Sequence, residues 1–155
     1  NDAALVIAHS FGTRTEDFVN MMNEEAHQLQ LNDTHFSDPS GASSGNAYSS
    51  AADLTRLATY AMQLSDFAQV VGQQTHQIAA TFSHHAYLWR NTKSLFSASS
   101  GINGVLVIDD GGAGACAVFS AQRNDRLLIG AELHAQSSNK LISDVKKILE
   151  VGFAQ

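Results

Sequence analysis

The sequence is poor in cysteine and in positive charge, and each shortage excludes a class of protein. Its single cysteine, Cys116, excludes an internal disulfide framework and a cysteine-rich zinc site. Nine basic side chains against fifteen acidic ones give a formal net charge of −6 at pH 7. That balance argues against nucleic-acid binding, which needs clustered Lys and Arg. No apolar run approaches the ~18 residues of a membrane span, so we expect no transmembrane segment.

What is present suits a folded domain. A chain of 155 residues, 44% of them hydrophobic and only one of them proline, favours a single domain with a packed core. The chain opens at Asn1 rather than at a methionine, and an apolar run is already under way at Leu5. We therefore expect a processed chain or a piece of a longer one.

Helical periodicity dominates the first part of the chain. A helix is predicted over residues 2–11, with Gly12 as its C-cap, and a second helix from an N-cap at Thr15. The apolar stripe of the second helix, which we expect to lie in the core, comprises Phe18, Met21, Met22, Ala26 and Leu29. A polar connector with a turn at residues 38–41 then leads to a helix capped by Ser49 or Ser50.

The pattern changes in the last third of the chain. Three apolar segments at residues 104–108, 115–121 and 127–133 predict strands, and a terminal helix is predicted from a cap at Ser138. The fold class is therefore α+β, with a helical lobe followed by an antiparallel meander and a C-terminal helix. We predict one domain over residues 1–155, with the helical lobe in 1–75 and the strands and terminal helix in 76–155.

Several blocks, in order along the chain, resemble the serine D-alanyl-D-alanine carboxypeptidases, the low-molecular-mass penicillin-binding proteins of the bacterial cell envelope. They are DFVNMMN at 17–23, LNDTHF at 31–36, YSSAADL at 48–54, AGAC at 113–116, RLLI at 126–129 and KILEVGF at 147–153. The resemblance implies the C-terminal half of a penicillin-binding or β-lactamase-like transpeptidase domain. It also implies a location in the periplasm or cell envelope.

In that family three motifs form the active site: Ser-x-x-Lys with the acylated serine, Ser-x-Asn, and Lys-Thr-Gly on an edge strand. The resemblance places Asn1 on the Asn of Ser-x-Asn, so the motif with the nucleophile falls outside this sequence. Leu106, Val107 and Ile108 occupy the Lys-Thr-Gly positions. Hydrocarbon side chains cannot donate hydrogen bonds to a substrate carboxylate, and each such charge-assisted contact is worth ~1.5–3 kcal/mol. We therefore expect that this chain does not hydrolyse D-Ala-D-Ala by itself.

Three functions remain open from the sequence. The first is a non-catalytic carboxypeptidase-like module that acts by binding or scaffolding. The second is one portion of an active serine-type D-Ala-D-Ala carboxypeptidase acting on peptidoglycan stem peptides, with the nucleophile supplied by a missing segment. The third is an unrelated α+β binding domain. We also expect another protein chain or a second copy to cover apolar surface on the 115–121 strand and on the 51–62 helix, with peptidoglycan peptide as a further candidate partner.

Other motifs favour structural interpretations. Ser137–Lys140 matches Ser-x-x-Lys but is typical of a helix cap, and the Ser-x-Asn and Gly-x-Ser-x-Gly matches in residues 41–46 lie in the polar connector. His84 and His85 are neighbours that would diverge on a strand, and we expect no metal and no cofactor. The aromatic group Phe82, Tyr87 and Trp89 fits either core packing, which we favour, or a sugar platform. Cys116 is expected to be buried.

Overall fold

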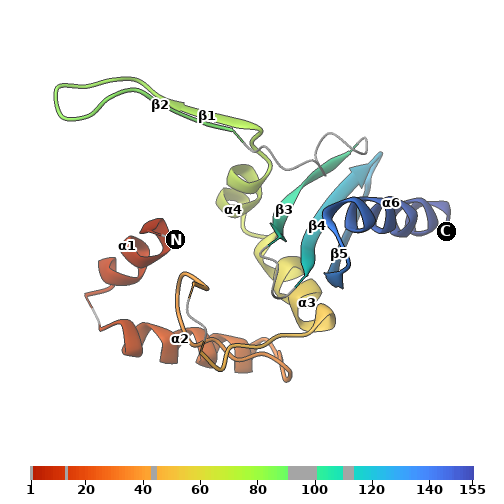
Figure 1. Cartoon of the computed structure of the whole chain (residues 1–155), viewed down its shortest axis with the longest axis horizontal. Helices are drawn as coiled ribbons and strands as arrows, with labels where there is room; N and C mark the ends of the chain where they lie inside the picture. The colour runs from red at the N-terminus through yellow and green to blue at the C-terminus, as the bar shows by residue number, and fades with distance from the viewer. Residues whose placement is uncertain (1, 13, 43–44, 91–100, 110–113) are drawn as a thin grey trace. The chain divides into compact units, whose positions relative to one another are not determined.

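A computed structural model of the chain describes residues 2–12, 14–42, 45–90, 101–109 and 114–155 (Figure 1). The side chains of residues 103–105 and 109 are outside this description. The chain divides into two compact units, Asn1–Leu57 and Ala58–Gln155, and each is described by itself. The mixture of helices and antiparallel strands confirms the α+β class.

The first unit begins with two helices, α1 (Asp2–Ser10) and α2 (Thr15–Gln28). Gly12 follows α1 with φ +68° and donates its N–H to the His9 carbonyl (3.0 Å), which confirms its role at the helix end. The predicted N-cap of α2 is wrong by one residue. Arg14 is the N-cap, because its backbone N–H donates to the Asp17 carboxylate at 3.3 Å and the helix starts one residue later.

A connector then leads to helix α3 (Ala51–Ala61), which crosses the boundary between the units. The predicted turn is present: the Asp38 carboxylate accepts the Ser40 N–H at 2.8 Å, and Gly41 has φ +69°. Ser50 caps α3 by accepting the Asp53 N–H at 3.1 Å, as one of the two predicted caps.

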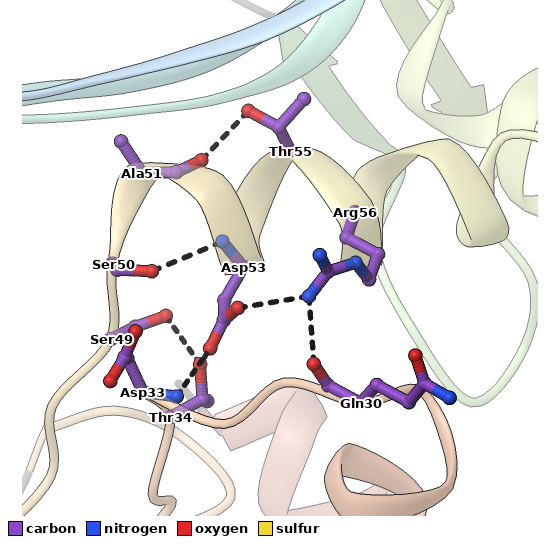
Figure 2. A network of polar contacts seen from close by, with 9 residues as sticks. All are labelled: Gln30, Asp33, Thr34, Ser49, Ser50, Ala51, Asp53, Thr55 and Arg56. Carbon is purple, nitrogen blue, oxygen red and sulfur yellow. Dashed lines mark hydrogen bonds and ion pairs between the residues drawn. The ribbon is translucent and has the colours of Figure 1, made fainter.

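The carboxylate of Asp53 is the centre of a polar network in the first unit (Figure 2). This side chain is buried, and its Oδ2 atom accepts hydrogen bonds from the Asp33 N–H and from the Thr34 hydroxyl, both at 2.8 Å. Its Oδ1 atom pairs with the Arg56 guanidinium at 3.3 Å, and Arg56 also donates to the Gln30 carbonyl at 2.7 Å. The network fixes the chain after α2 to the first turns of α3.

After the end of α3, the second unit continues with α4 (Ser65–Val71) and a two-stranded hairpin of β1 (Thr75–Ile78) and β2 (Tyr87–Arg90). The sequence pattern does not predict this hairpin. Two other predictions for this region are wrong. His84 and His85 lie between the strands rather than on one, and the aromatic side chains Phe82, Tyr87 and Trp89 are exposed rather than packed in a core.

The main sheet has the order β3–β4–β5, formed by β3 (Ile102–Asp109), β4 (Ala115–Arg123) and β5 (Arg126–Ala135), all antiparallel. Helix α6 (Ser138–Ala154) packs against β4 and β5, as Figure 1 shows in blue. Both the meander and the terminal helix were predicted. The N-cap is Ser137 rather than Ser138, because the Ser137 hydroxyl accepts the Lys140 N–H at 3.2 Å.

The core of the second unit lies between the sheet and α6. One face of β4 supplies alternate residues, and α6 supplies residues one turn apart. The fully buried members are Ala115, Ala117, Phe119, Ala121, Leu141, Val145 and Leu149. Ile148 on the same helix is 46% exposed, so the buried stripe of α6 does not include every apolar residue of the helix.

One carboxyl group lies against this core. Glu132 on β5 is paired in register with Ala117, and its Oε2 atom is buried with no hydrogen-bond partner among the described residues. Burial raises the pKa of the Glu132 carboxyl, and the Asp144 carboxylate on α6 adds to the rise. Asp144 itself pairs with Lys140, which lowers the pKa of the Asp144 carboxyl.

Replacement of Glu132 by glutamine is expected to stabilise the protein at neutral pH. Because folding raises the pKa of Glu132, this carboxyl contributes most to stability below the ordinary glutamate pKa. That contribution is lost as the pH rises through the raised value. We expect Glu132→Gln to raise the midpoint of thermal unfolding by ~2–4 °C at neutral pH and to have little effect near ~pH 4.

The matched control is Glu150→Gln, which removes an exposed carboxyl from α6. Thermal unfolding of the three proteins over this pH range is the measurement. An equal shift for both variants, or a Glu132→Gln effect that does not depend on pH, would contradict the assignment.

Candidate functional site

Strand β3 forms one edge of the main sheet in the part of the chain that the structure describes. It pairs with β4 on one side only, although α4 also contacts it. Leu106, Val107 and Ile108 lie in this strand, opposite Val118, Ala117 and Cys116 respectively. The three residues that the family resemblance singled out therefore occupy an edge strand.

The edge is positioned by the turn that enters β3. Gly101 has φ +92°, and its carbonyl accepts the Gln122 N–H at 2.9 Å, which fastens the start of β3 to β4. A Cβ atom at Gly101 would lie 2.5 Å from the Gln122 carbonyl oxygen. Only glycine fits both the left-handed backbone and the close approach.

The side chains of the edge alternate between the two faces of the sheet. Val107 packs against the core, whereas Leu106 and Ile108 are 52% and 42% exposed on the opposite face. Their neighbours on that face, Cys116 and Val118, are half-buried. The prediction that Cys116 is buried is therefore wrong, since α6 covers only the other face of β4.

This surface has a limited chemistry. Leu106, Val107 and Ile108 carry no side-chain nitrogen or oxygen, so a bound carboxylate would find no charge-assisted donor among them. The surface offers apolar contact and the backbone groups of an edge strand, which are the elements of strand pairing.

The other sequence candidates are not gathered at this edge. Asn1 and part of residues 41–46 lie outside the described residues. The Ser137–Lys140 match is a helix cap, as predicted, and the Lys140 ammonium pairs with Asp144. Within the described ranges, no three His, Cys, Asp or Glu side chains are grouped so that they could hold a metal ion.

The apolar stripe of α2 is also not the closed core that we predicted. Phe18, Met21 and Met22 line an open groove of about 470 Å³ in the first unit, and Met21 is 47% exposed. Leu31 and Phe36 form part of the same groove, and the polar edge is limited to Glu25. The prediction of one apolar face on α2 is confirmed, but the described residues do not cover this face.

Comparison with known proteins identifies relatives over the whole chain. A family model described as D-alanyl-D-alanine carboxypeptidase matches residues 1–137. A D-alanyl-D-alanine carboxypeptidase of Streptomyces sp. (strain K15) is 34% identical over 99% of this chain and 56% of its own length. The carboxypeptidase DacF of Bacillus subtilis is 27% identical over 100% of this chain and 40% of its own length.

A solved structure agrees with these sequence matches. The crystal structure of the Streptomyces K15 DD-transpeptidase matches with a TM-score of 0.89 and 34% identity, over 99% of this chain and 63% of that chain. The chain thus spans about half the length of the curated relatives that it matches. No described helix has the length and apolar character needed to cross a membrane.

Proposed function

Because this chain belongs to the D-alanyl-D-alanine carboxypeptidase family, we propose that it is a non-catalytic module of that kind, which acts by binding. The observation that carries the proposal is the composition of β3. At its exposed edge, Leu106 and Ile108 present hydrocarbon where the resemblance expects a lysine and a glycine.

The loss of these donors has a large energetic consequence. A lysine and a threonine that hydrogen-bond a substrate carboxylate contribute ~1.5–3 kcal/mol each. Leu106 and Val107 supply neither contact, and Ile108 adds a branched side chain where glycine would let the substrate backbone approach. A peptide ending in D-Ala-D-Ala therefore loses its main anchor at this edge.

The same residues suit a different ligand. An edge strand with apolar side chains on its open face can accept an added strand from another chain or a second copy. Half-buried Val118 extends the apolar surface inward from Leu106. We assign the binding function to this surface and, following the family, place the protein at the bacterial cell envelope.

A second candidate is one portion of an active serine-type carboxypeptidase. The observation in its favour is family membership itself, since the matched relatives are described as carboxypeptidases and the chain covers only 56% of one and 40% of another. In that case the Lys-Thr-Gly motif would have diverged, while the Ser-x-x-Lys and Ser-x-Asn motifs of the active site remained.

Turnover separates the two candidates. We expect the natural protein that contains this chain to release no D-alanine from a diacetyl-L-lysyl-D-Ala-D-Ala peptide, with the Streptomyces K15 relative as the positive control. Release above the buffer rate would favour the enzyme.

The binding function is tested with Leu106→Lys, which should weaken partner or self-association, whereas the same change at exposed Leu127 should not.

A further inference from the structure

The hairpin β1–β2 presents a row of aromatic rings. Register pairs His76 with Trp89 and Ile78 with Tyr87, so these four side chains share one face. The ring centroids of Trp89 lie 6.0 Å from His76 and 5.3 Å from Tyr87, with interplanar angles of 30° and 18°. Trp89 and Tyr87 are 50% and 45% exposed, so part of each residue remains available for contact.

A hollow lies at one end of this row. It has a volume of about 470 Å³ and is lined by His76 and Trp89 together with polar side chains from the end of α4 and the hairpin. Gln73, Gln74 and Arg90 supply the polar groups. The Gln73 carboxamide oxygen lies 3.1 Å from His76 Nδ1, which holds the imidazole beside the indole. The hollow therefore combines an aromatic wall with amide and guanidinium groups.

From this combination we propose that the hollow binds a pyranose ring of a neutral oligosaccharide. A pyranose has one apolar C–H face, which packs on an exposed aromatic ring, and hydroxyl groups around its rim, which pair with carboxamides and guanidinium. Trp89 supplies the ring, while Gln73, Gln74 and Arg90 supply the hydrogen-bonding groups. The Tyr87 ring stacks on the Trp89 indole and so supports its orientation.

The charges favour a neutral sugar over other ligands that stack on aromatic rings. A single-stranded nucleic acid needs a positively charged groove along its backbone, and among the described residues that line the hollow only Arg90 carries a permanent positive charge. The formal net charge of −6 also repels polyanions. This inference does not depend on the proposed function, because it concerns the hairpin and not β3.

The experiment uses the fact that Trp89 is the only tryptophan in the chain. Its fluorescence is followed while the chain is titrated with a β-1,4-linked tetramer of N-acetylglucosamine. We expect a saturable change in emission. Arg90→Met and Gln73→Leu should each weaken binding by about tenfold, the effect of losing one hydrogen bond of ~1.4 kcal/mol.

Two controls make the outcome decisive. Phe82→Ala removes an exposed aromatic ring outside the hollow and should leave the titration unchanged. Trp89→Leu, measured by calorimetry because it lacks the fluorophore, should abolish binding while circular dichroism stays unchanged. An emission that does not respond to the sugar would overturn the proposal. So would a response that survives Arg90→Met, or one given by polyuridylate or phosphatidylcholine vesicles instead of the sugar.

Discussion

Replacement of Phe119 by alanine is expected to lower the free energy of unfolding by about 3–5 kcal/mol, the range for removal of a buried aromatic side chain. Phe119 is only 2% exposed and belongs to the core between the sheet and α6. Its ring fills the space above Gly130 of β5, where an added Cβ would lie 2.7 Å from Phe119 Cζ. Because the space is shaped around the ring, alanine leaves a cavity that the backbone cannot close.

The chain offers a matched control for this substitution. Phe82 lies in the same unit and is fully exposed, so Phe82→Ala should change stability by less than ~0.5 kcal/mol. Urea unfolding followed by circular dichroism measures both variants. Similar effects of the two changes would contradict the position of the core.

The second large effect is expected in the first unit. Asp53→Ala should lower the free energy of unfolding by about 2–4 kcal/mol, because it removes the carboxylate that accepts hydrogen bonds from the Asp33 N–H and the Thr34 hydroxyl (Figure 2). The partly exposed Arg56 can turn to water, so the loss of the ion pair adds little. The effect therefore comes mainly from the two part-buried hydrogen bonds that the carboxylate accepts, and the Thr34 hydroxyl then keeps only its 2.9 Å contact with the Ser49 hydroxyl.

Asp33→Ala is the control for this prediction. It changes an exposed aspartate of the same network but keeps the backbone N–H that Asp53 accepts. Urea unfolding should show a change of less than ~0.5 kcal/mol for this variant. If Asp53→Ala lowered the free energy of unfolding no more than Asp33→Ala does, the conclusion that the Asp53 network joins the connector to α3 would be wrong.

The sequence predicted the helices and the main strands well and did not predict the short hairpin. Helix α6 has clear apolar periodicity because it buries one face, and β4 stands out as a continuous apolar run. The β1–β2 hairpin has two four-residue strands that are exposed on both faces, so no alternation reveals it. The observed caps, Arg14 and Ser137, lie one residue before the predicted ones, because Thr15 and Ser138 carry hydroxyl groups that suit a cap by residue type.

The candidate site was accessible to sequence reasoning only in part. The run Leu106–Ile108 reads as a strand from its composition, but its place at an edge depends on which strands pair, and that is a property of the tertiary fold. The hollow beside Trp89 could not be derived from the sequence, because it needs the register that brings His76 opposite Trp89. The sequence shows that Phe82, Tyr87 and Trp89 lie close together in the chain, but it does not show that their side chains are exposed.

The most direct measurement is covalent labelling of the natural protein with a fluorescent penicillin, read as intact mass and gel fluorescence. Penicillin acylates the same serine as the D-Ala-D-Ala substrate, so an adduct reports the catalytic machinery without turnover. Because Leu106, Val107 and Ile108 offer no side-chain donor to a carboxylate, we expect the protein to keep its unmodified mass, while the Streptomyces K15 relative is labelled in parallel. A stoichiometric adduct, suppressed by unlabelled penicillin, would contradict the account and establish an active enzyme.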